Sequence, residues 1–346
     1  MRVLVTGGSG FIGSHIVDEL LAAGHDVVVL DRAHAAKPSV PVGSIAYRRD
    51  DICDMEAVRA AVDGVDAVCH QAAMVGLGTD FGDVVDYVRV NDWGTATLLR
   101  ALHDAGFAGR FVLAGSMVVY GEGRYRCLDH GLVRPGPRDP ELLARHDWEP
   151  RCPTCGRSLD PEPVPESTAP DPRNVYAATK LQQEHLCALY GREHRIPVTA
   201  LRYHNVYGPR MPRDTAYAGV AAIFRSALVS GRAPIVFEDG GQLRDFVHVR
   251  DVARANRLAL EADVPWHGPL NIASGTPRSV LELATALWHA TGEHAPPPQI
   301  VPRFRTGDVR HVFASADEAV AQLDFKAEVS FACGIAELAA DPVHVQ

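Results

Sequence analysis

The chain of 346 residues is 47% hydrophobic, which is enough to bury a substantial core and lies outside the composition of disordered proteins. Its formal net charge of −9 argues against a nucleic-acid partner, and the lack of any apolar run of about 18 residues argues against a membrane span. Seven cysteines without an export-signal pattern lead us to expect a cytoplasmic protein, in which close cysteine pairs favour metal or redox chemistry over structural disulfides.

The first thirty residues predict a strand, a glycine-rich turn, a helix and a second strand. Residues 2–6 are a short β-branched run of the buried-strand type, and apolar residues at helical spacing follow from Ile12 to Leu21. A second apolar run, residues 27–30, ends at Asp31. This order is typical of a βαβ unit with a phosphate-binding turn.

The turn has the glycine spacing of a dinucleotide site. Gly7, Gly10 and Gly13 fit G-x-x-G-x-x-G, and Gly8 with the last two fits G-x-G-x-x-G. Glycines at these positions let the backbone approach a pyrophosphate and direct helix N–H groups at it. Because a strand and a helix bracket the turn, we expect a dinucleotide here and not merely a tight turn.

The end of the second strand bears on which dinucleotide binds. Asp31 is suited to accept hydrogen bonds from ribose hydroxyls and to repel a 2′-phosphate, which favours NAD over NADP. The neighbouring Arg32 weakens that preference.

Further motifs follow along the chain. In order, they are DDICD at 50–54, HQAA at 70–73, VNDWGT at 90–95, GSMVVYG at 115–121, YAATK at 176–180, RYHNVYGPR at 202–210, QLRDFVHVRDVA at 242–253 and GDVRH at 307–311. Together they resemble the extended short-chain dehydrogenase/reductase family, and within it the NAD-dependent nucleotide-sugar epimerases and dehydratases. The resemblance covers nearly the whole chain, apart from one insertion and the last few residues.

The resemblance implies an α/β fold with a doubly wound parallel (Rossmann) sheet. We expect the NAD-binding domain in residues 1–205, interrupted by an insertion at 122–173. A smaller nucleotide-sugar-binding region, mixed with parts of the first domain, is expected in 206–346. Strand-like runs at 65–69, 110–114 and 197–201 alternate with helical patterns at 83–104 and 174–194, as such a sheet requires.

By the same resemblance, NAD is held tightly by residues from several motifs. His204 is expected to contact the nicotinamide and not to act as a base. The expected cofactor-binding residues are Gly7, Gly10, Phe11, Ile12, Gly13, Asp31, Arg32, Asp51, Ile52, Gln71, Ala72, Ala73, Asn91, Tyr176, Lys180 and His204.

The predicted catalytic residues are Ser116, Tyr176 and Lys180. Tyr176 and Lys180 are four residues apart on a predicted helix, so their side chains share a face. A free tyrosine, with a pKa of about 10, is a poor base at neutral pH, but a neighbouring ammonium and a cationic nicotinamide both favour its phenolate. The resemblance implies that Tyr176 takes a proton from a sugar hydroxyl while hydride leaves the same carbon for NAD, and that Ser116 hydrogen-bonds the reacting oxygen.

The residues after Ser116 indicate the type of reaction. Family dehydratases carry Asp-Glu at the next two positions, and decarboxylating relatives carry a glutamate at the second of them. This chain has Met117 and Val118, which cannot carry a proton. Such a site can oxidise a carbon and reduce it again, which favours epimerisation at C4.

The expected substrate is a nucleotide-diphosphate sugar. Arginine suits the diphosphate because its planar fork binds phosphate oxygens bidentately. The expected substrate-binding residues are Ser116, Met117, Tyr176, Asn205, Arg244 and Arg310.

The segment between Ser116 and Tyr176 is unusually long for the family. These residues lie 60 positions apart, and residues 122–173 hold ten of the 24 prolines with little apolar periodicity. A small segment that cannot form a hydrophobic core of its own needs another source of stability, such as a disulfide or a bound metal ion.

The insertion contains residues suited to bind a metal ion. Cys127 with His130 and Cys152 with Cys155 give the spacing C-x2-H-x21-C-x2-C, typical of two zinc-ribbon knuckles. We therefore expect a zinc-ribbon-like segment with structural Zn²⁺ on these four ligands. A redox cysteine pair and a coincidental spacing are the alternatives.

The insertion, together with the segments SMVVYGEGRYRC and DTAYAGVAAIFRSAL, looks most like the dTDP-L-rhamnose 4-epimerase branch of the family. The mainly small and apolar segment PRDTAYAGVA suits a 6-deoxy sugar, although Arg210 and Arg213 would suit a uronic carboxylate. The alternatives are a UDP-glucose or UDP-glucuronate 4-epimerase, an NAD(P)H-dependent 4-ketoreductase of a dTDP-sugar, and a non-catalytic dinucleotide-sensing protein. The resemblance also implies a homodimer.

Overall fold

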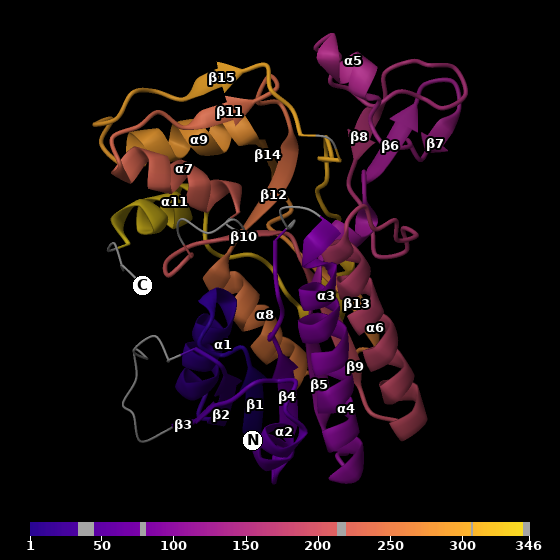
Figure 1. The fold of residues 1–346 in the computed structure, drawn as a ribbon, viewed down its shortest axis with the longest axis vertical. Helices are drawn as coiled ribbons and strands as arrows, with labels where there is room; N and C mark the ends of the chain where they lie inside the picture. Colours follow the sequence, from indigo (N-terminus) through magenta and orange to yellow (C-terminus); the bar gives the residue numbers. More distant parts are fainter. Residues whose placement is uncertain (34–44, 77–80, 213–218, 306, 342–346) are drawn as a thin grey trace.

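The computed structural model describes residues 1–33, 45–76, 81–212, 219–305 and 307–341. Its main feature is a seven-stranded parallel sheet in the order β3-β2-β1-β4-β5-β9-β13 (Figure 1). The doubly wound α/β prediction is confirmed. The strands are β1 (Arg2–Thr6), β2 (Asp26–Asp31), β3 (Ile45–Arg49), β4 (Ala67–His70), β5 (Arg110–Ser116), β9 (Val198–Tyr203) and β13 (Gly268–Ile272).

Helices cover both faces of this sheet. The side chains of β1 alternate between two cores: Val3 and Val5 pack with α1 and α8, whereas Leu4 packs on the opposite face. This alternation explains why the strand is apolar throughout. One face carries α1 (Phe11–Ala22) and α8 (Val249–Glu261), and the other carries α2 (Met55–Val62), α4 (Gly94–Asp104) and α6 (Val175–His194).

The helix expected over 83–104 is not a uniform α-helix. A short 3-10 turn, η2 (Phe81–Asp83), leads into α3 (Val84–Tyr87), the π-helical stretch η3 (Val88–Trp93) and then α4. The π-helical stretch includes the buried Asn91, whose side-chain Oδ1 accepts a hydrogen bond from the Met74 N–H at 2.7 Å. Such π-helical stretches are often found at functional sites.

A smaller layer stands beyond the carboxyl ends of the main strands. It contains the sheet β10-β12-β14 and the parallel pair β11 and β15, packed around a separate apolar core. Two elements from residues 206–346, α8 and β13, return to the main sheet. The elements of this layer are β10 (Asn205–Tyr207), α7 (Val220–Val229), β11 (Ile235–Phe237), β12 (Leu243–His248), β14 (Pro277–Ser279), α9 (Val280–Ala290), β15 (Gln299–Val301) and α11 (Phe331–Ala340), whereas α10 (Asp317–Leu323) packs on β13.

The insertion projects beside this layer, at the upper right of Figure 1. After η4 (Met117–Tyr120) it forms β6 (Arg124–Cys127), β7 (Gly131–Val133), α5 (Pro140–Ala144) and β8 (Asp160–Glu162), with sheet order β7-β6-β8. Its own buried cluster is small, comprising Tyr125, Cys127, Cys152 and Leu159 with Val133 packed against them. Among the described residues, no helix is long and apolar enough to cross a membrane.

Candidate functional site

A cavity of about 1120 Å³ extends from the glycine-rich turn at the end of β1 to the inner surface of the smaller layer. One end is lined by Gly7, Ile12 and Asp31, and the other by Phe237 and Arg244. Ligands of doubly wound sheets bind at this edge, where the strand order reverses.

The glycine-rich turn leaves no room for larger side chains. A Cβ atom added to Gly13 would lie 2.1 Å from the Gly7 carbonyl oxygen, and one added to Gly7, where φ is +69°, would lie 2.7 Å from the Ala72 nitrogen. The helix α1 begins here with Gly10 as its N-cap, which provides no side-chain cap. Its first N–H groups are thus the kind of donors that bind pyrophosphate.

Asp31 lies at the carboxyl end of β2 on the cavity wall. Its Oδ2 accepts from the Ser9 N–H at 3.0 Å and its Oδ1 from the Ala33 N–H at 2.9 Å. These two bonds hold the carboxylate in a fixed orientation beside the glycine-rich turn. A carboxylate so placed suits an adenosine ribose.

Most of the predicted site residues line this one cavity. Asn91 does not line it: its amide bridges Met74 and Thr179, tying the segment after β4 to helix α6. Those that do line it are Gly7, Gly10, Phe11, Ile12, Gly13, Asp31, Arg32, Asp51, Ile52, Gln71, Ala72, Ala73, Ser116, Met117, Tyr176, Lys180, His204, Asn205 and Arg244.

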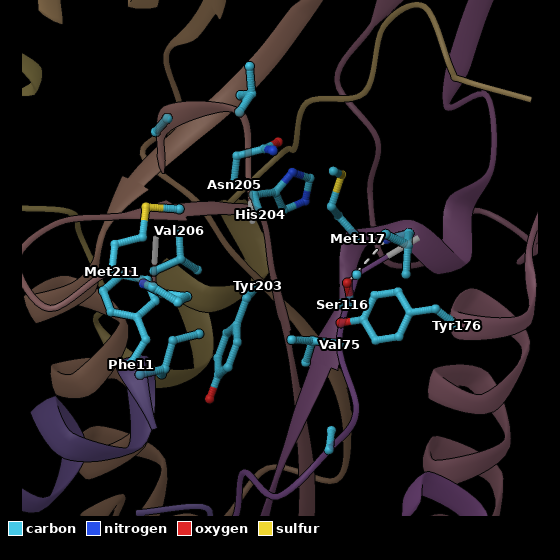
Figure 2. A pocket seen from close by; sticks show the side chains of 18 of the residues that line it. Phe11, Val75, Ser116, Met117, Tyr176, Tyr203, His204, Asn205, Val206 and Met211 are labelled. Atoms are coloured by element: carbon cyan, nitrogen blue, oxygen red, sulfur yellow. Dashed lines mark hydrogen bonds between the residues drawn. The ribbon is translucent and has the colours of Figure 1, made fainter. Parts of the chain in front are cut away.

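The side chains of Ser116 and Tyr176 meet at the centre of the cavity. Figure 2 shows the Tyr176 phenol oxygen directed at the Ser116 hydroxyl, with one residue from the end of β5 and the other from the first turn of α6. Burial raises the pKa of Tyr176, and a hydrogen bond with Ser116 opposes that rise. Burial thus favours the phenol, and ionisation of Tyr176 depends on positive charge nearby.

Lys180 is 3% exposed and lies one helical turn after Tyr176. Burial lowers its pKa to about 8. Its Nζ donates to Gln183 Oε1 at 2.7 Å, and the Gln183 amide donates to Thr95 Oγ1 at 2.7 Å. A series of buried hydrogen bonds thus fixes the Lys180 ammonium at the cavity wall. The sequence motifs did not predict these hydrogen bonds.

The cavity wall around Ser116 combines apolar and polar groups. Met117 and Val118 line it directly after the serine. His204 is buried and burial lowers its pKa to about 4, so the imidazole is neutral at pH 7 and suited to contact rather than to proton transfer. Asn205 Oδ1 is buried and has no hydrogen-bond partner among the described residues, which leaves it available to a ligand.

The two arginines predicted to bind diphosphate differ in their surroundings. Arg244 lines the cavity, and its guanidinium donates to the Leu243, Val309 and Arg310 carbonyls at 2.7–2.8 Å. Arg310 does not line the cavity and is surrounded by carboxylates.

Arg305 was missed by the sequence reasoning. It lines the cavity and lies over the Phe237 ring, 5.4 Å from the centroid. Arg305 lies two positions before Gly307, the first residue of the motif GDVRH, so a motif extended towards the N-terminus includes it.

The four predicted metal ligands come together in the insertion, away from this cavity. All four ligand atoms of Cys127, His130, Cys152 and Cys155 lie within 4.8 Å of one another. Cys127 Sγ is 3.5 Å from His130 Nδ1 and 3.6 Å from Cys155 Sγ, and Cys152 Sγ is 3.7 Å from His130 Nδ1. For tetrahedral zinc with Zn–S of about 2.3 Å and Zn–N of about 2.05 Å, simple geometry gives roughly 3.8 Å between sulfurs and 3.6 Å between sulfur and nitrogen.

The backbone of both knuckles also favours thiolates. Hydrogen bonds from His130 and from backbone N–H groups lower the pKa of Cys127 to about 6, and the N–H groups of Cys155 and Thr154 help to lower that of Cys152. Gly131 and Gly156 follow the two knuckles at φ of +66° and +71°. This donor set suits a d¹⁰ metal ion such as zinc.

The chain belongs to the NAD-dependent epimerase/dehydratase family, whose model matches residues 3–139 and 154–273. It is 33% identical to a dTDP-L-rhamnose 4-epimerase of Burkholderia thailandensis, covering 97% of this chain and 93% of that one. It is 30% identical to a putative UDP-glucose 4-epimerase of Methanocaldococcus jannaschii, covering 96% and 95%. Its fold resembles the crystal structure of the Thermus thermophilus UDP-glucose 4-epimerase complex with NAD, with a TM-score of 0.78, 32% identity and 98% of each chain covered.

Proposed function

We propose that the protein is an NAD-dependent nucleotide-sugar 4-epimerase, an isomerase, and that its substrate is dTDP-L-rhamnose or its C4 epimer. The observation that carries the reaction type is the wall beside the catalytic pair. Ser116 and Tyr176 face each other, while Met117 and Val118 offer no acid or base for dehydration. The relative with 33% identity supports the choice of sugar.

The glycine-rich turn, the uncapped start of α1 and the Asp31 carboxylate fit NAD. NAD held by these residues would supply a reversible hydride acceptor for C4 of the sugar. Tyr176 removes the proton from the C4 hydroxyl and later restores it, while Ser116 holds the oxygen. Lys180 supplies positive charge that favours the phenolate.

At the other end of the cavity, Arg244 and Arg305 are proposed to bind the diphosphate, with Asn205 Oδ1 accepting a substrate hydrogen bond. Arg210 donates to Asp18 Oδ2 at 2.5 Å, an ion pair that disfavours its use for a uronic carboxylate. Arg213 and most of the segment PRDTAYAGVA lie outside the described residues.

The proposal is tested by incubating the purified protein, without added cofactor, with dTDP-L-rhamnose, UDP-glucose and UDP-glucuronate and analysing the products by NMR. We expect C4 epimers from dTDP-L-rhamnose at the highest kcat/KM. Tyr176→Phe should lower turnover at least about 10²-fold and leave NAD bound. Stoichiometric consumption of NADPH in a parallel incubation that contains it would identify a ketoreductase, and inactivity on every sugar would favour a dinucleotide sensor.

We further propose that Cys127, His130, Cys152 and Cys155 bind one structural Zn²⁺. The ligand separations and thiolate-directed N–H groups support this, and the insertion has only a small core. Elemental analysis should find about one zinc per chain. A metal-free, fully active protein, or a Cys152–Cys155 disulfide under reducing conditions, would refute the assignment.

Finally, we propose that the protein is a homodimer. Val85, Trp93 and Leu189 are 70%, 62% and 55% exposed on α3, η3 and α6, which pack side by side (Figure 1). A second copy is the proposed partner because one apolar helical face can bury itself against its own symmetry mate. Light scattering should give twice the chain mass for the wild type and less for Trp93→Glu; a monomeric wild type would exclude the dimer.

A further inference from the structure

The insertion contributes an arginine to a buried ion cluster beneath the substrate end of the cavity. The Arg138 side chain is 4% exposed. Its Nη1 donates to Glu238 Oε2 at 3.0 Å, and its Nε and Nη2 donate to the Asp308 carbonyl oxygen at 3.1 and 2.7 Å. One guanidinium thus joins two segments of the smaller layer: the turn after β11 and the loop that contains GDVRH.

A second residue of the insertion binds the same loop. Glu149 Oε1 accepts from Arg310 Nη2 at 2.7 Å and from Nε at 2.9 Å, and Glu149 Oε2 lies 2.9 Å from His311 Nε2. Arg310 also binds Glu238 and Asp239. This network occupies the guanidinium of Arg310, which does not line the cavity.

The loop held in this way orients residues that line the cavity. The Val309 and Arg310 carbonyls accept from the two terminal nitrogens of Arg244 at 2.7 Å each. Residues 307–310 form no helix or strand, so these side-chain bonds help to hold that loop in place.

The backbone conformation of Glu238 independently indicates that contacts from other segments hold the turn after β11 in place. It lines the cavity and has φ of +59°, in the left-handed region that costs free energy for a residue with a Cβ. Its carboxylate is 3% exposed and binds both Arg138 and Arg310. Such a conformation persists where the surroundings over-determine it.

We propose that the insertion is a clamp on the substrate site, in which Arg138 and Glu149 are positioning residues that preset Arg244 and the 307–310 loop for a nucleoside diphosphate. This inference rests on the proposed function, because it assumes that the Arg244 end of the cavity binds the diphosphate. The family model leaves residues 140–153 unmatched, so Glu149 lies outside the matched part of the chain, whereas Arg138 lies within it. The clamp acts on binding and not on the proton transfer at Tyr176.

The test compares Arg138→Gln, Arg138→Lys and Glu149→Gln with the control Arg134→Gln. Arg134 is in the same insertion, but its side chain is 42% exposed, and its contacts with the Ala169 carbonyl and the Asp171 carboxylate stay within that segment. For each protein, calorimetry gives the Kd of dTDP and of UDP, kinetics give KM and kcat on the sugar that the wild type epimerises, and extraction gives the bound NAD.

We expect Arg138→Gln to raise the KM and the nucleotide Kd at least tenfold while kcat stays within about threefold and bound NAD is unchanged. Arg138→Lys should recover part of the affinity, because it keeps the charge but not the planar fork. Glu149→Gln should weaken binding less, since Glu149 is 36% exposed, and it also serves as the test if Arg138→Gln does not fold. Arg134→Gln should match the wild type.

Wild-type KM and Kd in both Arg138→Gln and Glu149→Gln would overturn the clamp, as would a fall in kcat at unchanged KM. Equal weakening by Arg134→Gln would do so too, because it would show a general effect of destabilising the insertion. A wild type that binds neither dTDP nor UDP would instead refute the proposed function on which the clamp rests.

Discussion

Replacing Gly13 by alanine should weaken NAD binding without unfolding the chain. The added Cβ would lie 2.1 Å from the Gly7 carbonyl oxygen and 2.9 Å from the Gly8 Cα, whereas ordinary contacts begin near 3.4 Å. The overlap with the oxygen is about 1.3 Å, and both partners are backbone, so no side-chain rotation relieves it. The turn has to open, which moves the N–H groups meant for the pyrophosphate.

Overpacking of this kind costs about 1–3 kcal/mol, which corresponds to roughly 5- to 150-fold in affinity if it falls entirely on the bound state. The assay is calorimetric titration of NAD into protein freed of nucleotide, with the thermal midpoint measured in parallel. Gly136→Ala is the matched control, because a Cβ there meets no atom within 4 Å. A Kd for NAD within twofold of the wild type in Gly13→Ala would refute the reasoning.

Three other substitutions test further parts of the site. Asp31→Ala should weaken NAD binding and narrow the preference over NADP, because the ribose hydroxyls lose their acceptor; unchanged selectivity in a titration would remove Asp31 from the site. Gln183→Met removes the acceptor of the Lys180 ammonium. Because the ammonium is present below its pKa of about 8 and lost as pH rises through it, the alkaline limb of kcat/KM should move to lower pH, and an unmoved limb would exclude this role. Cys152→Ser should release zinc, make residues 122–173 sensitive to limited proteolysis and raise the sugar KM while NAD stays bound; retention of one zinc per chain would contradict it.

The main sheet was predictable because each element has a local signature. The runs at 110–114 and 197–201 became β5 and β9 with bounds shifted by no more than two residues. The helical pattern at 83–104 did not reveal the π-helical stretch Val88–Trp93, since these six residues make little more than one turn and are too few to show a hydrophobic period of their own. The insertion was recognised by its prolines and spacing, but its three-stranded sheet was not predicted.

The sequence by itself determined those parts of the site that lie within one element or one turn. The glycine spacing before α1, the carboxylate at the end of β2 and the four-residue separation of Tyr176 and Lys180 all follow from local geometry.

Only the tertiary structure decided which distant residues meet. Arg305 and Arg310 are only five positions apart, yet Arg305 lines the cavity, whereas Arg310 does not line it and forms ion pairs with Glu149, Glu238 and Asp239. The orientation of an arginine side chain depends on the carboxylates that packing brings within hydrogen-bond distance. These carboxylates come from segments 71 to 161 residues away, a relation that no periodicity along the chain encodes.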